Sequence, residues 1–411
     1  MNLIALNQFS KNYYPMKTKF LIPALLFYTG MLSAVSINLK VTNPNKGELK
    51  NAPVVISLDK YKDIPSNKRA ELAVYVNGKQ ISSQLDDLNK DGVPDELVFL
   101  LDLNANQTQP VIVKTIPASQ RENFPTEVYA DMISKTKDGK KEFVTEISSV
   151  KNDMYNKMHH HGVAFESALI AYRIYFDNKS TIDVYAKNKQ QLELATTEWY
   201  PTDEQAAAGY GDDVIRVFNA VGVGTVKGWD GTKATHIDKF DKRTQRIVAT
   251  GKLRTVVESE VEGWLYEGKK INMTVRYILY ARHRDAIAEV RASEDITNLA
   301  TGVMTISGGP TMSDHKGLLG SWGTDYPVTD TVKYEKQTCG LGVSVPRKYI
   351  TKEVTEGLNN LILMPYHKGE TLRFYLTSGA LKEEKRPFTT ADQFFAYLKQ
   401  WGAALEPVIV K

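Results

Sequence analysis

Short runs of β-branched and aromatic residues recur along most of the chain, and this spacing constrains the fold more than any other feature. Asn, Asp, Gly and Pro separate the runs at short intervals, as in antiparallel sheets. The pattern therefore predicts β-sandwiches rather than alternating strands and helices. The first such runs are VVISL at 54–58, LAVYV at 72–76, ELVFLLDL at 96–103 and VIVKTI at 111–116.

The same pattern divides the chain into four parts. Between 119 and 152 it weakens and charge rises, and KTKDGKKE at 135–142 is typical of an exposed turn, so we expect a linker there. Longer runs then resume, which predicts a large two-sheet sandwich. The predicted parts are an upstream extension with a signal peptide at 1–35, a small N-terminal β domain at 36–118, a linker region at 119–152 and a large β-sandwich domain at 153–411.

Two short segments have helical spacing. One is 202–209, and the other is 389–405, which Thr389 or Thr390 would cap. We expect the second segment to pack on the large sandwich as a C-terminal helix. Its apolar residues at helical spacing are Phe394, Phe395, Leu398 and Trp401.

The N-terminal segment has the layout of a secretory signal. Lys17 and Lys19 precede an apolar run at 20–35 that ends in small residues. The run has about 16 residues, short of the roughly 20 that span a bilayer, so cleavage is favoured over a single membrane anchor. We expect a natural start at Met16, a mature protein beginning near Ser36, and a periplasmic or secreted location without a membrane partner.

Charge and composition exclude several partners. The 52 basic and 48 acidic residues are spread along the chain, without the basic clusters that bind nucleic acid. Cys339 is the only cysteine, so no intrachain disulfide is expected, and TCGLGVSV around it is typical of a strand with a buried thiol. The glycines of 209–231 are not followed by a helix in the manner of a phosphate loop, and we expect no organic cofactor.

An Asp- and Asn-rich loop lies between two predicted strands in QLDDLNKDGVPDELVF at 84–99. Its alternating oxygen side chains and Gly92 are arranged as in calcium loops. However, Val98 stands where an EF-hand has a glutamate, and strands are predicted where an EF-hand has helices. The alternative is a hairpin whose side chains bind its own amides. The candidate Ca²⁺ ligands are Asp87, Asn89, Asp91 and Asp95.

A polar strand follows a histidine-rich loop in the segment 158–187. Tyr172 and Ile174 alternate with Arg173 and Tyr175 along it, so an arginine and a tyrosine share one face. Sugars are held by such groups, because their rings stack on aromatics and their hydroxyl and carboxylate oxygens accept hydrogen bonds from arginine. The strand is therefore a candidate sugar-binding surface.

The loop before this strand carries three adjacent histidines. Neighbours in an extended chain point to opposite faces, so they rarely share a metal ion. Imidazole titrates near neutrality, which makes His160 or His161 a candidate general acid or base. A histidine that only fixes the loop is the alternative.

The segment 198–236 is rich in aromatics, acids and glycines, which is typical of loops that line clefts at a sandwich rim. About half of its aromatics should be core residues. Further along, ARHRDA at 281–286 carries His283 and Arg284, which either grip a uronate or belong to a solvated hairpin. The candidates in 198–236 are Trp199, Tyr200, Tyr210, Trp229, Asp203, Asp212, Asp213, Lys227 and His236.

Several long motifs resemble an exported bacterial family known as domain of unknown function 4861. They are QLDDLNKDGVPDELVFL, HGVAFES, AYRIYFDNKSTIDVYAK, YPTDEQAAAGYGDDVIRV and GTVKGWDGTKATHI. The resemblance implies a galactose-mutarotase-like β-supersandwich and a place in bacterial polysaccharide-utilisation loci. It supplies no catalytic residues. The family usually has HGPA where this chain has a valine, Val163, which affects only the rigidity of the loop.

We therefore expect an exported carbohydrate-active protein, an enzyme that acts on uronic-acid-containing oligosaccharide or polysaccharide as a lyase or a glycoside hydrolase. A non-catalytic carbohydrate-binding protein and a sugar mutarotase are the alternatives. All of them need the loop of His161 and Glu166 to meet the rim at 200–229 in one open groove. The expected substrate-binding residues are His160, Tyr175, Tyr200, Lys227, Trp229, His236, His283 and Arg284.

The two reactions assign different catalytic residues. Elimination needs a cation beside the uronate, a base and an acid, for which the candidates are Arg173 or Arg284, then His161, then Tyr172 or Tyr175. Hydrolysis needs two carboxylates that flank the bond. The candidates for this pair are Glu166 with Asp212 or Asp213.

Overall fold

The computed structural model describes residues 35–152 and 154–411, and β-strands dominate this part of the chain. The predicted signal peptide lies outside the described residues except at its last position, Val35. No helix in the described ranges is long and apolar enough to cross a membrane. The prediction of a mostly β chain with a small N-terminal β domain, a large sandwich and a C-terminal helix is confirmed.

The N-terminal β domain is a sandwich of two antiparallel sheets, in the orders β29-β1-β7-β3-β4 and β2-β6-β5. Alternate residues such as Val54 and Val113 are fully buried between them. The elements are β1 (Ser36–Thr42), β2 (Leu49–Ser57), η1 (Leu58–Lys60), α1 (Ser66–Arg69), β3 (Leu72–Val76), β4 (Lys79–Ile81), β5 (Ser83–Asp86), β6 (Glu96–Leu103), β7 (Thr108–Thr115) and β29 (Ile409–Val410).

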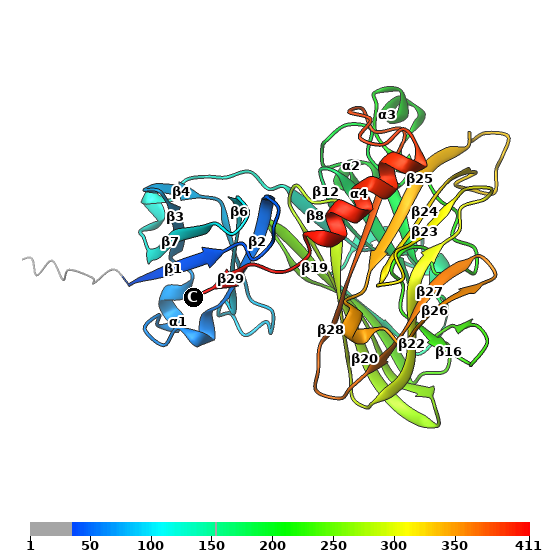
Figure 1. Cartoon of the computed structure of the whole chain (residues 1–411), viewed down its shortest axis with the longest axis horizontal. Helices are drawn as coiled ribbons and strands as arrows, with labels where there is room; N and C mark the ends of the chain where they lie inside the picture. Colours follow the sequence, from blue (N-terminus) through cyan, green and yellow to red (C-terminus); the bar gives the residue numbers. More distant parts are fainter. Residues whose placement is uncertain (1–34, 153) are drawn as a thin grey trace, which may run out of the picture. The chain divides into compact units, whose positions relative to one another are not determined.

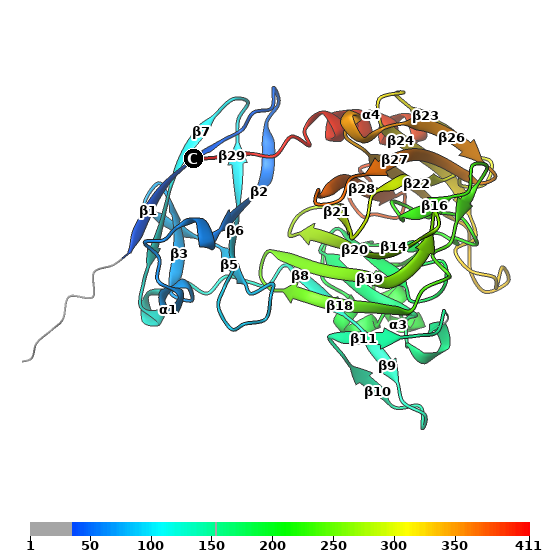
Figure 2. The same ribbon diagram turned by 90° about the horizontal axis from the view of Figure 1, so that it is seen from below.

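The large domain is built on a nine-stranded antiparallel sheet, whose strands β18 to β21 lie side by side in Figure 2. Long runs of alternating residues such as RTVVESEVEGWLY form its longest strands. In spatial order the strands are β11 (Glu146–Ser149), β18 (Lys242–Thr250), β19 (Arg254–Tyr266), β20 (Lys269–Tyr280), β21 (Asp285–Ala292), β28 (Leu372–Ala380), β25 (Gln337–Ser344), β24 (Leu318–Asp325) and β23 (Thr311–Ser313).

Two five-stranded sheets share the main core with the nine-stranded sheet. Phe165, Val303 and Phe374, one from each of the three sheets, belong to a single buried cluster. The first five-stranded sheet, here called the site sheet, contains β15 (Asp212–Asp213), β14 (Ile182–Ala186), β13 (Ile170–Tyr175), β12 (Gly162–Ser167) and β8 (Val128–Asp131). The second contains β17 (Ala234–Thr235), β16 (Lys227–Trp229), β22 (Ile296–Met304), β27 (Asn359–Tyr366) and β26 (Lys352–Glu356).

The remaining elements are short, apart from one helix. Helix α3 confirms the helical spacing of 202–209, and the Thr202 side chain caps it by accepting from the Gln205 amide. The short elements are the hairpin β9 (Ile133–Lys135) and β10 (Lys141–Phe143), the 3-10 turns η2 (Ala118–Gln120), η3 (Tyr155–Lys157) and η4 (Arg347–Tyr349), and the helices α2 (Leu194–Thr197) and α3 (Asp203–Ala207).

Helix α4 (Ala391–Ala403) lies across β24 and β25 and begins at its cap Thr390 (Figure 1). Its residues Phe394 and Leu398 are fully buried, as their helical spacing predicts. Glycines on the strands allow this close approach. A Cβ at Gly340 would lie 2.5 Å from the Phe394 ring, and one at Gly342 would lie 2.3 Å from Leu398.

The region predicted as a linker, 119–152, differs from that prediction. β8 pairs with β12 in the site sheet, and β11 pairs with β18 in the nine-stranded sheet. Both strands therefore belong to the large sandwich. Their shortness, at four residues each, makes the alternating pattern too brief to stand out among charged residues.

Candidate functional site

A pocket of about 680 Å³ opens beside the site sheet, in the size range of ligand sites in proteins. Strands β13 and β15 supply its polar wall, and the loops around Lys179, Phe218 and Val328 supply the rest. We call it the Asp213 pocket. The lining residues that matter most are Tyr155, Arg173, Tyr175, Tyr200, Asp213 and Phe218.

The alternation of β13 decides which side chains reach the Asp213 pocket. Arg173 and Tyr175 line it, whereas Tyr172 and Ile174 are buried in the main core. This separation was predicted from the period of two in an extended strand. It places Tyr172 away from the pocket, where its hydroxyl donates to the Arg284 carbonyl at 2.6 Å.

Arg173 lies at the centre of the site, and only 1% of its surface is exposed to solvent. Its guanidinium donates to Asp183 at 2.5 Å, to the Tyr175 hydroxyl at 2.6 Å and to the Tyr200 hydroxyl at 3.1 Å. Burial works to lower the pKa of Arg173, but Tyr175, Asp213 and Asp183 together raise it above its ordinary value. Arg173 therefore stays charged and holds four polar side chains in place.

Asp213 is the carboxyl group of the pocket that most favours a proton. Burial raises the pKa of Asp213 well above its usual range, Arg173 opposes this effect, and Asp183 adds to it. One carboxyl oxygen accepts from the Trp199 indole at 2.5 Å, and the other lies 3.7 Å from the Arg173 guanidinium. The protonated form of Asp213 is thus favoured, and in this form the carboxyl group can donate a proton.

His161 lies beside the same aromatic side chains. Its ring stacks on Tyr155 at 3.5 Å between centroids, and its Nδ1 lies 2.8 Å from the Tyr155 carbonyl. A carbonyl only accepts, so Nδ1 carries the hydrogen in the neutral ring and Nε2 is left as an acceptor. Burial lowers the pKa of His161 to about 4, so the ring is neutral at pH 7. A neutral imidazole with a free Nε2 is able to accept a proton.

Some backbone strain lies at this site. Thirteen described non-glycine residues have a positive φ, a conformation that L-residues with side chains rarely adopt. Three of them, Ser180 (48°), Trp199 (77°) and Phe218 (46°), line the pocket or stand beside a lining residue in the chain. Strain of this kind costs of order 1–3 kcal/mol per residue and clusters at functional sites.

The structure brings only part of the predicted site together. His161 and Tyr200 lie 6.3 Å apart between ring centroids, so the histidine loop does meet the rim at Tyr200. The rim does not extend to Trp229, which pairs with β22 and β17 in the second five-stranded sheet through β16. The prediction of a single groove along the whole rim from 200 to 229 is therefore wrong, because only the end at Tyr200 meets the histidine loop.

Glu166 shares the face of Arg173 on neighbouring strands but does not line the pocket. It is fully buried, forms an ion pair with Lys187, and accepts hydrogen bonds from the backbone amides of Glu193 and Leu194. These partners fix the start of α2. The predicted pairing of Glu166 with Asp213 across a sugar is thus wrong, because all of its oxygens are occupied inside the protein.

Asp212, His160 and His161 also lie outside the set of lining residues, although the His161 ring stacks on the lining residue Tyr155. Burial raises the pKa of Asp212, opposed by Lys382, and one of its oxygens accepts from the Asp213 amide at 2.7 Å. His160 is fully buried with its Nε2 2.8 Å from Asp131. Its backbone carbonyl accepts from Arg173, so its loop helps to place that side chain.

Lys227 and His236 form a separate buried pair. The Lys227 ammonium donates to the Lys179 carbonyl and lies 3.1 Å from Nδ1 of His236. Burial lowers the pKa of Lys227 to about 7 and that of His236 to about 4. Neither side chain lines the pocket, and Lys227 holds the loop of Lys179 through its hydrogen bond to the Lys179 carbonyl.

His283 and Arg284 are held by other parts of the protein. His283 contacts Asp285 at 3.0 Å and the Asn51 carbonyl at 2.9 Å. Arg284 pairs with both oxygens of Glu383 at 2.9 Å. Neither residue lines the Asp213 pocket, so neither can bind the carboxylate of a uronate in that pocket.

The loop of Asp87, Asn89, Asp91 and Asp95 binds its own backbone. Both oxygens of Asp87 accept from the amides of Asp91 and Gly92, and one oxygen of Asp95 accepts from the amides of Leu88 and Asn89. No cluster of three His, Cys, Asp or Glu side chains suited to a metal occurs within residues 35–152 and 154–411. The Ca²⁺ site at this loop stays a prediction.

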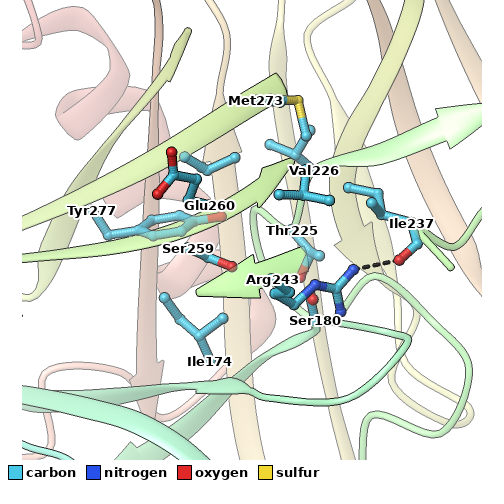
Figure 3. Close-up of a pocket in the computed structure, with 12 residues that line it drawn as sticks. Ile174, Ser180, Thr225, Val226, Ile237, Arg243, Ser259, Glu260, Met273 and Tyr277 are labelled. Atoms are coloured by element: carbon cyan, nitrogen blue, oxygen red, sulfur yellow. Dashed lines mark hydrogen bonds between the residues drawn. The ribbon is translucent and has the colours of Figure 1, made fainter. Parts of the chain in front are cut away.

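A second cavity lies inside the large sandwich (Figure 3). Its volume is about 20 Å³, enough for a water molecule but not for a sugar. Arg243 points into this region and donates to the carbonyls of Ile237 and Asp177. This cavity is therefore a packing feature of the core, and the Asp213 pocket is the better candidate site.

Sequence reasoning missed several groups of the pocket. Tyr155, Asp183 and Phe218 were not named as candidates, and Trp199 was expected on a surface although it is fully buried. Asp183 has a signal, since it pairs with Arg173 in register on the next strand. Nothing in the order of residues indicates that the turn at Phe218 approaches β13.

The fold and the site together define a β-sandwich protein with a polar, aromatic-lined pocket at the edge of its large domain. The chain belongs to the family described as Domain of unknown function (DUF4861), whose model matches residues 41–410. The family resemblance seen in the motifs is thus confirmed. No curated protein matches the chain.

Two solved structures from Enterococcus faecalis are similar to the chain at a distance. One is a protein in the glycosyl hydrolase family 38, with 8% identity and a TM-score of 0.45, and the other is an alpha-mannosidase, with 8% identity and a TM-score of 0.44. The alignments cover 92% of this chain but 47% and 46% of those chains. The chain thus spans about half the length of each.

Proposed function

We propose that the protein is an exported carbohydrate-active enzyme that cleaves a glycosidic bond of a uronic-acid-containing oligosaccharide in the Asp213 pocket. The observation that carries the proposal is the buried carboxyl of Asp213 beside Arg173 in a pocket lined by tyrosines. Sugar rings stack on such aromatic faces, and sugar hydroxyls bond to their polar edges. The periplasmic or secreted location and the Ca²⁺ loop belong to this proposal as well.

The geometry favours hydrolysis over elimination. Arg173, the cation assigned to an elimination, is already engaged by Asp183, Tyr175 and Tyr200, whereas the raised pKa of Asp213 suits the general acid of a hydrolysis. In hydrolysis, Asp213 gives its proton to the departing sugar oxygen as the bond to the anomeric carbon breaks. His161 takes a proton from the water whose oxygen joins that carbon, which balances the reaction.

The uronate carboxylate would meet two other cations of the pocket. Lys179 and Arg216 both line it, and the Nε of Arg216 is buried without a hydrogen-bond partner in the described part of the chain. Arg216 donates to the Val328 carbonyl at 3.4 Å and Lys179 to the Phe218 carbonyl at 3.1 Å, and the Lys179 ammonium also lies 3.8 Å from the Asp177 carboxylate. An acidic sugar is therefore a better fit than a neutral one.

The test is turnover of pectic, alginate and glycosaminoglycan oligosaccharides by the purified protein. Hydrolysis predicts new reducing ends without the ultraviolet absorbance of unsaturated uronates, and elimination predicts both. Asp213→Asn should lower kcat by about 10²- to 10⁴-fold, because the proton donor is lost.

Asp212→Asn is the comparison that separates the two adjacent carboxyl groups, and it should keep most of the turnover. Equal losses in the two variants would refute the assignment of Asp213. Binding without turnover across the whole panel would instead indicate a carbohydrate-binding protein.

A further inference from the structure

Phe218 is an exposed aromatic side chain on the wall of the Asp213 pocket. It is 43% exposed and lies in the turn after β15, in which the Ala220 amide bonds to the Val217 carbonyl at 2.9 Å. Tyr200, at 40% exposed, is the other large hydrophobic of the pocket that is comparably open to solvent. The exposed ring lies on the pocket wall, where a ligand in the pocket would contact it.

The protein holds this ring in place from behind. The Arg216 guanidinium covers one face at 4.0 Å from the ring centroid, and the Lys179 ammonium donates to the Phe218 carbonyl at 3.1 Å. One face of the ring is thus supported, and the other is available. A supported ring with a bare face is the arrangement on which a sugar ring stacks.

The backbone at Phe218 is also strained. Its φ is 46°, a conformation that glycine or asparagine adopts more readily than phenylalanine. Strained backbone of this kind clusters at ligand sites. The strain at Phe218 therefore agrees with a role of its ring in the pocket.

We propose that the bare face of Phe218 is a stacking platform for the sugar unit next to the one that is cleaved. This inference rests on the proposed function, because it places the reacting unit beside Asp213. The substrate is then an oligosaccharide of at least two units, and Phe218 determines its affinity for the longer chain.

The test measures binding in an Asp213→Asn background, in which the ligand is not consumed. Calorimetric titration compares galacturonic acid with trigalacturonate, and mannuronic acid with trimannuronate. Phe218→Asn in this background should weaken binding of the preferred trimer about tenfold and leave the monomer unchanged, since asparagine keeps the backbone conformation but lacks the ring. Phe218→Tyr should retain the affinity.

Phe143→Asn is the matched control, because Phe143 is 63% exposed on β10 and does not line the pocket. Phe218→Asn should keep or raise the melting temperature, which a purely structural role would lower. The platform is refuted if monomer and trimer are weakened equally, if neither is weakened, or if no trimer binds more tightly than its monomer. Full turnover in Asp213→Asn alone refutes the proposed function and not the platform.

Discussion

Arg173 and Arg243 are two buried arginines of the same sandwich, but the protein compensates their charges in different ways. Arg173 is 1% exposed and is held by carboxylate and tyrosine side chains beside the open pocket. Arg243 is 2% exposed and is held by two backbone carbonyls in the interior. Burial lowers the pKa of Arg243 to about 10, whereas the partners of Arg173 raise its pKa.

The difference shows where the fold places its reactive groups. Two carbonyls hold Arg243, and the charges of Asp177 and Asp238 offset only part of the effect of its burial. The carboxylates around Arg173 interact with one another, and this interaction contributes to the raised pKa of Asp213. Close compensation by acids therefore leaves a carboxyl group with a raised pKa at the pocket, whereas in the core the pKa of the arginine itself is lowered.

The largest effect is expected at Arg173. Arg173→Met leaves Asp183 buried without its cation, so the free energy of unfolding should fall by about 3–5 kcal/mol in urea denaturation at pH 7. Adding Asp183→Asn should restore part of this loss, because the unpaired charge is removed. If the free energy of unfolding falls by less than about 1 kcal/mol, water rather than Arg173 stabilises the charges of the acids.

A smaller effect is expected at Arg243. Arg243→Met leaves the carbonyls of Asp177 and Ile237 without their donor, which should cost about 1–3 kcal/mol in the same denaturation measurement. No acid variant should restore the loss, since no carboxylate bonds to this guanidinium. A larger loss than that of Arg173→Met would overturn the comparison.

The smallest expected effect is on the pH dependence of the melting temperature. It involves one histidine near each of the two arginines. Burial lowers the pKa of both His161 and His236 to about 4, so the folded protein favours their neutral forms. Their contribution to stability is complete above pH 6.5 and is lost as the pH falls towards 4. The melting temperature should fall over this window, and His161→Asn or His236→Asn should each reduce the fall. If the melting temperature of both variants falls with pH as steeply as that of the unchanged protein, the assignment of this pH dependence to the two histidines is wrong.

The sequence was sufficient for features that depend on local periodicity. The alternation of β13 correctly separates Tyr172 from Arg173, and the apolar spacing of α4 correctly identifies Phe394 and Leu398 as buried. These features follow from the geometry of one strand or one helix. The fold class could be predicted for the same reason.

The pocket depends on contacts between distant segments, which local patterns predict less well. Glu166 and Asp213 are both acids in polar motifs, but only the structure shows that Lys187 and two backbone amides occupy Glu166. Phe218 follows a strand of two residues, and its exposure depends on a turn with positive φ. Local patterns do not encode which loops meet across three sheets.

Strand β29 pairs with β1, so that Val410 lies opposite Val41. The outer edge of the N-terminal sheet is thus supplied by residues that are synthesised only after the entire large domain. Until then, β1 presents free amides and carbonyls along that edge, and such an edge invites pairing with another chain. The whole chain must therefore be synthesised before this edge of the smaller domain is protected against pairing with another chain.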